Sequence, residues 1–398
     1  MKRIYIGRRA ALAGGVAAFA SPAVLRAQTD PIKLATLTPL TGAGGSYGPT
    51  MAKVAASVVE EVNKAGGVLG RRVVLVSEDD QTSPEPAVRA ARKLIDVDKV
   101  VAIMGTWASS VTTAVAPLCW ESKTFLCTVS GADSITLLPH QGFLIRTQPN
   151  STLQVTRVGE FILSLGAKKV FTMIPQTPFT QATFDILNAV LPKGGATHQS
   201  LIYDDKKTTY RTEVDQALRT SPDVILANGY TPDSIVLLKD IYRAGFKGKI
   251  LGFAYSINQK LIDQIGQPEV VEGVYTFAPS PAEGSTAYEK VKAAVGSANP
   301  DPYTCQVYDH TNMVLMSMAF AKEASGTAIK DNIRKVTQGG GKAVDNAADG
   351  IKAIAAGEKV DYTGASGPCD FDDKGDILDC KFRYEQIKSG KFTVVKIA

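Results

Sequence analysis

The sequence predicts an α/β protein with two lobes, each built on a doubly wound parallel sheet. Short apolar runs typical of buried strands alternate with stretches of helical periodicity, as in βαβ units. This alternation occurs in two series, near residues 31–147 and 148–276. From about 277 the pattern is less regular, which indicates that the chain returns to the first lobe. Several crossings between the lobes would form a hinge rather than a loose tether.

The first series begins with a strand at 32–37, and a Gly-rich loop follows at 41–48. The expected helices lie at 51–62, 84–97 and 109–122, and the further strands at 72–77, 100–104, 124–128 and 143–146. Gly66 and Gly67 can end the first helix, because glycine adopts the left-handed conformation of a C-terminal cap. Pro84 suits the first turn of the second helix, where a missing N–H breaks no hydrogen bond.

The second series repeats this alternation. We expect helices at 152–165, 179–191, 210–219 and 232–244, and strands at 169–174, 198–203, 223–227 and 249–252. Beyond it, helices are expected at 285–296, 305–324 and 327–336, a glycine-rich loop at 338–350, and closing strands at 381–385 and 391–397. The expected N-terminal lobe therefore comprises 28–147 plus 277–378, and the C-terminal lobe 148–276 plus 379–398.

The first 27 residues have the pattern of a cleaved secretory signal. Basic residues at positions 2, 3, 8 and 9 precede an apolar run at 10–20, and Ala27 offers a small residue at a cleavage point. The apolar run is too short for a stable membrane anchor, although an uncleaved anchor is the alternative. The Arg8-Arg9 pair suggests the twin-arginine export route.

The charge balance does not favour nucleic acid or a membrane surface as partner. Residues 1–27 hold five of the 44 Lys and Arg residues and none of the 39 Asp and Glu residues. The remaining chain therefore has 39 basic and 39 acidic residues, a net charge of zero.

The five cysteines are Cys119, Cys127, Cys305, Cys369 and Cys380. Cys369 and Cys380 flank the turn-like 372–376, and a hairpin there would bring them opposite each other, so we predict a disulfide in an oxidising compartment. Cys119 and Cys127 also suit small core positions, and the pairing of the other cysteines stays open. No cysteine or histidine spacing is typical of zinc, and we expect no metal or other cofactor.

Catalytic motifs are missing from the sequence. The Gly-rich segment 42–48 is not followed by Gly-Lys-Ser/Thr, so a flexible turn that approaches a ligand closely is favoured over a phosphate loop. There is no Gly-x-Ser-x-Gly or His-Glu-x-x-His motif. We therefore predict a protein that is not an enzyme, with a secreted hydrolase as the alternative.

Several motifs resemble the branched-chain amino-acid-binding (Leu/Ile/Val-binding) proteins, the periplasmic receptors of ABC importers. Three of them occur in order at 38–42, 60–71 and 78–81, and others at 105–110, 146–147 and 372–376 extend the resemblance over nearly the whole chain after the signal. It implies the type I periplasmic binding protein fold, with two lobes, a cleft and a three-segment hinge. It also implies a periplasmic monomer that closes on a small carboxylate ligand and docks on a membrane permease. A sensor that presents its closed form to a signalling receptor is the alternative.

The resemblance also indicates a carboxylate site. In the family a serine after the third strand binds the ligand carboxylate, and Ser109 occupies that position. It begins a helix, where free N–H groups and the helix dipole favour an anion, although a simple N-cap serine would look the same. A backbone-lined segment follows the next strand, here Ser130, Gly131 and Ala132. The family often has threonine where this chain has Ala132, so we expect one hydroxyl contact of the family to be missing here.

Aromatic residues follow several predicted strands. The family's aromatic lid positions match Tyr47, Phe179 and Tyr230, and Trp107, Phe253 and Tyr255 lie near the same strand ends. Ligands of α/β proteins bind at such strand ends, although a single aromatic residue is more often part of the core.

One departure from the family concerns the ligand's ammonium group. Amino-acid binders place an acid after the strand equivalent to 249–252, whereas this chain has Phe253-Ala254-Tyr255 there. A buried ammonium without a partner costs several kcal/mol. We therefore predict an apolar or aromatic carboxylate as ligand. A branched-chain amino acid is the alternative if Asp133, which could instead cap a turn, supplies the charge.

Overall fold

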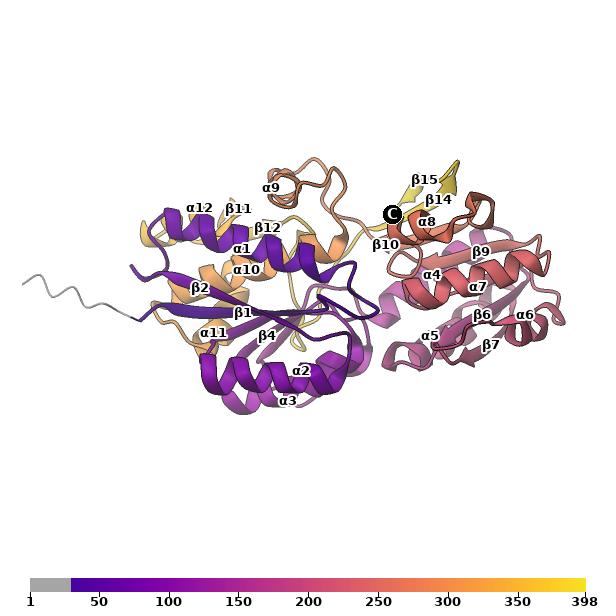
Figure 1. Ribbon diagram of the computed structural model, residues 1–398. Coiled ribbons are helices and arrows are strands. Elements are labelled where there is room, and N and C mark those ends of the chain that lie inside the picture. Colours follow the sequence, from indigo (N-terminus) through magenta and orange to yellow (C-terminus); the bar gives the residue numbers. More distant parts are fainter. Residues whose placement is uncertain (1–29) are drawn as a thin grey trace, which may run out of the picture. The chain divides into compact units, whose positions relative to one another are not determined.

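The computed structural model describes residues 30–398, so the expected export signal at 1–27 lies outside the described residues. From Pro31 onward the chain forms two lobes built on mainly parallel sheets, together with a small third sheet (Figure 1). The structure thus confirms the predicted α/β fold class.

The first sheet has the strand order β2-β1-β3-β4-β5, and all its pairs are parallel. Its strands are β1 (Ile32–Thr38), β2 (Val73–Asp79), β3 (Ala102–Thr106), β4 (Phe125–Thr128) and β5 (Leu144–Arg146). The helices α1 (Gly48–Lys64) and α10 (Pro302–Ala321) pack on one side, and α2 (Pro84–Arg92) and α3 (Ser109–Ser122) on the other (Figure 1). The expected second helix continues beyond α2 as a π-helical turn, Lys93–Asp98.

The second sheet repeats this order in its five parallel strands. They run β7-β6-β8-β9-β10, and the antiparallel β14 and β15 extend the sheet beside β10. Its strands are β6 (Lys169–Pro175), β7 (Thr197–Tyr203), β8 (Val224–Ala227), β9 (Lys249–Phe253), β10 (Tyr275–Pro279), β14 (Phe382–Lys388) and β15 (Lys391–Ile397). Its helices are α4 (Ser151–Ser164), α5 (Pro178–Val190), α6 (Arg211–Leu218), α7 (Thr231–Arg243) and α8 (Gln259–Ile265). Because β10 belongs wholly to this sheet, the second crossing follows Pro279 instead of falling at 276/277.

The prediction of a loop over 338–350 is wrong. The segment contains β11 (Lys342–Val344) and the start of α12 (Ala347–Ala355), and β11 pairs with β12 (Val360–Gly364), which pairs with the short β13 (Gly367–Pro368). Asn346 caps α12 by accepting the N–H of Asp349 at 2.9 Å. A Cβ on Gly341 would stand 2.4 Å from the Lys359 backbone, so this glycine permits close strand pairing and does not mark a flexible loop.

Each lobe has its own hydrophobic core, and the chain crosses between the lobes three times. The crossings follow β5, follow β10, where α9 (Thr286–Val295) comes next, and precede β14. An isolated bridge between Arg146 and Asp376 brings the first and third crossings side by side. Among residues 30–398 no helix combines the length and apolar character needed to cross a bilayer.

The predicted Cys369–Cys380 disulfide is wrong, because all five cysteines are free thiols. The turn does form, but its bridge pairs Phe371 with Ile377, a register that places residue 379 opposite Cys369. A shift of one residue turns a side chain to the opposite face. Cys369 accordingly packs in the core of the first lobe, and Cys380 packs against a core of the second.

Candidate ligand-binding site

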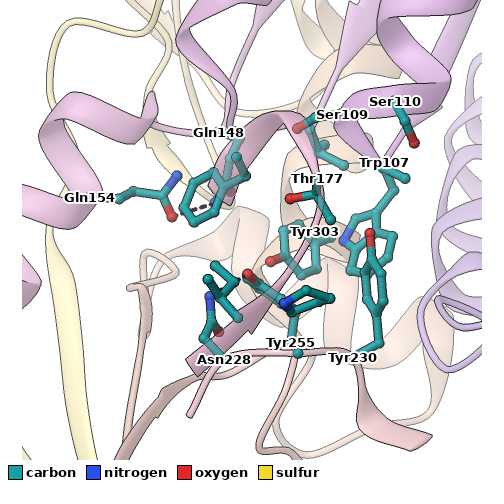
Figure 2. A pocket seen from close by; sticks show the side chains of 17 residues that line it. Trp107, Ser109, Ser110, Gln148, Gln154, Thr177, Asn228, Tyr230, Tyr255 and Tyr303 are labelled. Atoms are coloured by element: carbon teal, nitrogen blue, oxygen red, sulfur yellow. Dashed lines mark hydrogen bonds between the residues drawn. The ribbon is translucent and has the colours of Figure 1, made fainter. Parts of the chain in front are cut away.

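A cavity lies between the two lobes at the carboxyl ends of their parallel strands. The space among its lining atoms, solvent at its mouth included, is about 590 Å³. Its wall is formed by Trp107, Ala108, Ser109, Ser110, Val129, Gly131, Gln148, Gln154, Ile174, Pro175, Thr177, Phe179, Asn228, Gly229, Tyr230, Tyr255 and Tyr303. Figure 2 shows how these side chains surround the space. The position agrees with the rule that open α/β sheets bind ligands outside their strand ends.

The N-terminus of α3 forms one end of the cavity. Ala108 is the N-cap residue and offers no side-chain cap, and the first intrahelical bond runs from the Thr112 N–H to the Ala108 carbonyl. The amides of Ser109, Ser110 and Val111 therefore have no acceptor within the helix. Ser109 Oγ accepts the Ala132 N–H at 3.2 Å, which leaves its own hydrogen for another acceptor. These free donors and the helix dipole favour an anion here.

Aromatic rings from both lobes form the apolar wall. Tyr255 lies with its ring centroid 6.1 Å from that of Trp107, 6.3 Å from that of Tyr230 and 6.5 Å from that of Phe179. Tyr303, at the start of α10, packs edge-on against Trp107 at 5.8 Å. Burial raises the pKa of Tyr255 and of Tyr303 well above their usual range, so both phenols stay neutral and can donate a hydrogen bond.

Tyr47 connects the lobes beside this wall. Its ring stacks on Trp107 with centroids 5.4 Å apart. Its hydroxyl donates to the Ala254 carbonyl at 3.0 Å and accepts the side-chain N–H of Asn258 at 2.7 Å, and both partners belong to the second lobe. Tyr47 therefore fastens the lobes together and does not form part of the cavity wall.

Three buried amide side chains follow one another at the back of the cavity. Gln306 donates to Gln148 Oε1 at 2.8 Å, and Gln148 donates to Gln154 Oε1 at 3.0 Å. Gln154 in turn donates to the carbonyl of Pro149. The two members that line the cavity, Gln148 and Gln154, both come from the first crossing segment and the start of α4.

The cavity wall carries no ionic side chain. Among the described residues that line it there is no Asp, Glu, Lys, Arg or His. Asp133, the proposed source of a negative charge, instead binds the start of α4. Its carboxylate accepts the N–H of Thr152 at 3.1 Å and the hydroxyl of Thr152 at 2.8 Å. The role of Asp133 in the structure is therefore a cap.

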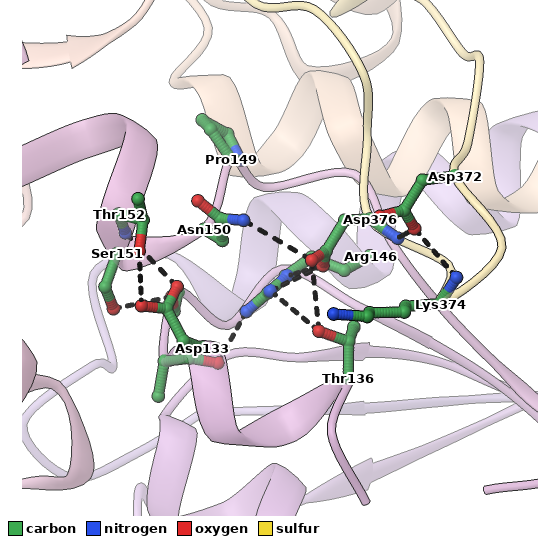
Figure 3. Close-up of polar contacts among 12 residues, drawn as sticks. Asp133, Thr136, Arg146, Pro149, Asn150, Ser151, Thr152, Asp372, Lys374 and Asp376 are labelled. Carbon is green, nitrogen blue, oxygen red and sulfur yellow. Dashed lines mark hydrogen bonds and ion pairs between the residues drawn. The ribbon is translucent and has the colours of Figure 1, made fainter.

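A buried ion pair supports the cavity from the hinge side (Figure 3). The fully buried Arg146 donates from Nε to Asp376 Oδ1 at 2.8 Å, and its Nη2 also pairs with that oxygen. Its Nη1 donates to the Ala132 carbonyl at 2.6 Å and to the Ser130 carbonyl at 3.4 Å. The Gly131 carbonyl between them accepts the hydroxyl of Ser151 at 2.9 Å. All three carbonyls of this segment thus bind hinge residues.

The structure brings most of the predicted site residues together. Those that line the cavity are Trp107, Ser109, Gly131, Phe179, Tyr230 and Tyr255, and those that do not are Tyr47, Ser130, Ala132 and Phe253.

Ser130, Ala132 and Phe253 lie behind the cavity wall, which corrects the prediction that they line the site. The hydroxyl of Ser130 donates to the Trp107 carbonyl at 2.8 Å, so its side chain points into the first lobe. Ala132 is buried behind Ser109, and Phe253 packs behind Phe179 and Tyr255.

Several cavity residues were not predicted from the sequence: Ser110, Gln148, Gln154, Thr177, Asn228 and Tyr303. Asn228 and Thr177 follow the carboxyl ends of β8 and β6, and this position could have identified them. Nothing in the local sequence distinguishes Gln148 or Tyr303, because the three-dimensional path of the hinge and of α10 places them. Within the described chain no three His, Cys, Asp or Glu side chains gather as a metal site would.

Comparison with known proteins supports what this architecture indicates. The periplasmic binding protein family matches residues 31–391, so the chain belongs to that family. A relative from Pseudomonas aeruginosa, "Amino acid binding protein", is 26% identical over 71% of this chain and 76% of its own. The "Chemotactic signal transduction system substrate-binding protein BasB" of Halobacterium salinarum is 25% identical over 86% of this chain and 83% of its own.

Two solved structures show the same fold. The leucine-binding protein LivK of Thermotoga maritima superposes with a TM-score of 0.78, at 22% identity, over 92% of this chain and 98% of its own. A solute-binding protein of an ABC transporter from Rhodopseudomonas palustris, in complex with p-hydroxybenzoic acid, gives a TM-score of 0.75. It is 16% identical over 93% of this chain and 97% of its own. The predicted family and the type I fold are thereby confirmed.

Proposed function

We propose that this protein is the periplasmic solute-binding component of an ABC importer, and that its ligand is an apolar or aromatic monocarboxylate without an ammonium group. One observation carries the proposal. The cavity combines an uncapped helix N-terminus with aromatic walls and has no ionic side chain among its described lining residues.

The carboxylate would bind at the start of α3. Backbone amides at a helix N-terminus and a hydroxyl such as that of Ser109 can hold both oxygens of a carboxylate. Each hydrogen bond to a charged group contributes roughly 1.5–3 kcal/mol. The site needs no cationic side chain, because the amides and the helix dipole supply the positive potential.

An α-amino acid would leave its ammonium group without a partner. The acid that amino-acid binders place after β9 is absent, and Asp133 binds Thr152 instead. The Ser130, Gly131 and Ala132 carbonyls each already accept a hydrogen bond from Arg146 or Ser151, and Ala132 offers no hydroxyl. A buried charge without a partner costs roughly 3–5 kcal/mol, or a factor of about 100 or more in affinity.

The rings of Trp107, Phe179, Tyr230 and Tyr255 favour an apolar or aromatic body for the ligand. The R. palustris protein shows that this fold can hold an aromatic acid, p-hydroxybenzoic acid. LivK shows that the same fold also serves a leucine-binding protein, so the fold alone does not decide between the two classes. The composition of the cavity wall favours an aromatic or apolar acid over leucine.

Binding would act through closure of the hinge. The anion site belongs to the first lobe and most of the aromatic wall to the second, so a ligand that contacts both stabilises the closed form. Tyr47 already bridges the lobes in this form. The protein would then release its ligand to a membrane permease, and it would perform no chemistry itself.

Calorimetric titration tests this proposal. Leucine, isoleucine, valine and phenylalanine would be compared with their counterparts that lack the amino group, and with benzoate. We expect micromolar binding of at least one monocarboxylate and binding at least about 100-fold weaker for each amino acid. Tighter binding of leucine than of 4-methylpentanoate would overturn the proposal.

A matched pair of variants on α3 locates the carboxylate. Ser109→Ala should weaken binding by roughly 1–3 kcal/mol, because a hydrogen bond to a charged group is lost. Ser122→Ala is the control, since Ser122 lies at the other end of the same helix and bonds only to its own turn and the adjoining Thr124. Equal affinities of the two variants would remove Ser109 from the site.

A second candidate function is ligand sensing for a signalling receptor. The similarity to the H. salinarum chemotactic protein favours it. A strain that lacks this protein would separate the two functions. Loss of uptake of the bound acid supports transport, whereas intact uptake with a lost response to the acid supports sensing.

A further inference from the structure

The directions of the hydrogen bonds around the cavity restrict the ligand further than charge alone. The Pro149 carbonyl can only accept, so it must receive the N–H of Gln154. Gln154 Oε1 therefore accepts from Gln148, and Gln148 Oε1 accepts from Gln306. Each of these two oxygens thus already accepts one hydrogen bond, whereas each Nε2 has a second hydrogen for which the other glutamines and Pro149 supply no acceptor.

Tyr255 has its direction fixed in the same way. The backbone N–H of Phe253 donates to Asn228 Oδ1 at 3.3 Å, which turns Asn228 Nδ2 toward Tyr255. That nitrogen donates to the Tyr255 hydroxyl at 2.7 Å. The phenol hydrogen of Tyr255 consequently points to another acceptor. Three cavity residues of fixed direction, Gln148, Gln154 and Tyr255, therefore all offer donors.

The donor of Gln154 lies beside the anion site. Its Nε2 is 3.0 Å from the position that a Cβ on Gly131 would occupy. The next residue, Ala132, donates its N–H to Ser109 Oγ at 3.2 Å. An atom next to the carboxylate of a ligand would therefore meet an amide donor. The carbonyls of the same segment accept hydrogen bonds from the hinge residues Arg146 and Ser151.

From these directions we infer that the preferred ligand carries a hydrogen-bond acceptor, and no donor, on the carbon next to its carboxylate, as a 2-oxo acid does. The keto oxygen accepts the N–H of Gln154 or Gln148 where an amino acid would present its ammonium. A 2-hydroxy acid can accept the same bond, but among the groups of fixed direction its own hydrogen would meet only oxygens that already accept one hydrogen bond. This inference rests on the proposed function, because it assumes that the carboxylate binds at α3.

A matched ligand series tests the inference by calorimetric titration. On the leucine skeleton it comprises 4-methyl-2-oxopentanoate, 2-hydroxy-4-methylpentanoate, 4-methylpentanoate and leucine, and on the phenylalanine skeleton phenylpyruvate, 3-phenyllactate, 3-phenylpropanoate and phenylalanine. On the skeleton that binds, we expect the 2-oxo acid to bind three- to tenfold more tightly than the acid without the keto group, which corresponds to one hydrogen bond. The 2-hydroxy acid should be weaker than the 2-oxo acid, and the amino acid the weakest.

Variants connect this preference to the amide chain. Gln154→Met removes the amide donor but keeps a side chain of similar length. The affinity for the 2-oxo acid divided by the affinity for the acid without the keto group should therefore fall to about one. Gln148→Met is a second variant in case the first does not fold. Gln181→Met, on the exposed face of α5, is the control and should leave the ratio unchanged.

The possible failures are distinguishable. If the acids without a keto group bind as tightly as the 2-oxo acids, the inference is wrong and the proposed function stands. The same holds if the 2-hydroxy acids bind more tightly than the 2-oxo acids. An unchanged ratio in both glutamine variants also overturns the inference. If the amino acids bind more tightly than all other members, the proposed function itself fails.

Discussion

The Arg146–Asp376 pair provides a quantitative test of how the hinge supports the cavity. Arg146 is fully buried and the Asp376 side chain is 13% exposed. Burial lowers the pKa of Arg146, and the attraction of Asp376 acts against that shift. Asp376→Asn keeps the shape of the side chain but removes the charge. Because it leaves a buried guanidinium without a counter-charge, we expect a loss of roughly 3–5 kcal/mol in the free energy of unfolding.

Urea denaturation and thermal unfolding measure this loss. At roughly 1.3 °C per kcal/mol for a chain of this length, the midpoint temperature should fall by about 5 °C. The control is Asp331→Asn, because Asp331 forms a surface ion pair with Lys330 at 2.8 Å and its side chain is 54% exposed. Exposed pairs contribute about 0–1 kcal/mol. A loss in Asp376→Asn no larger than in the control would refute the view that this buried pair holds the hinge together.

Three further predictions follow from single contacts. Tyr47→Phe removes both interlobe bonds of the hydroxyl and should weaken ligand binding up to about tenfold. Small-angle X-ray scattering should show a larger radius of gyration for this variant without ligand than for the wild type. An unchanged radius and an unchanged affinity would contradict the role of Tyr47 in holding the lobes closed. Burial raises the pKa of Asp80 to about 7, so the folded protein holds this proton more tightly than the unfolded chain and wild-type stability should fall as pH rises from about 4 to about 7. The stability of Asp80→Asn should not fall over this pH range. Parallel curves of stability against pH for the variant and the wild type would refute the role of Asp80. Finally, denatured but unreduced protein should alkylate at Cys369 and Cys380, and a linked peptide containing both residues in a mass map would contradict the structure.

Much of the fold could be predicted because its βαβ units leave strong local signals. The expected helix at 109–122 matches α3, and the expected strand at 391–397 matches β15. The failures have tertiary causes. β11 and α12 form in a glycine-rich segment because β11 pairs with β12 and Asn346 caps the helix. No local pattern of the sequence shows such pairing.

The candidate site was predictable where residues follow strand ends. Trp107, Ser109 and Tyr230 were found in this way, and each lines the cavity. The orientation of a side chain was not predictable. Ser130 follows a strand end as well, but its hydroxyl bonds to the Trp107 carbonyl inside the first lobe. Gln154 lies on a helix of the second lobe, and the fold of the hinge brings it to the cavity.

The central claim is that the cavity holds a monocarboxylate by the N-terminus of α3 and has no place for an ammonium group. A crystal structure of the protein with the tightest-binding acid of the titrations tests it most directly. We expect the carboxylate oxygens within hydrogen-bond distance of Ser109 Oγ and of the Ser110 amide, and the body of the ligand against Trp107 and Tyr255. A ligand whose carboxylate lies away from α3, or a bound amino acid whose ammonium group contacts an acidic side chain, would contradict the claim.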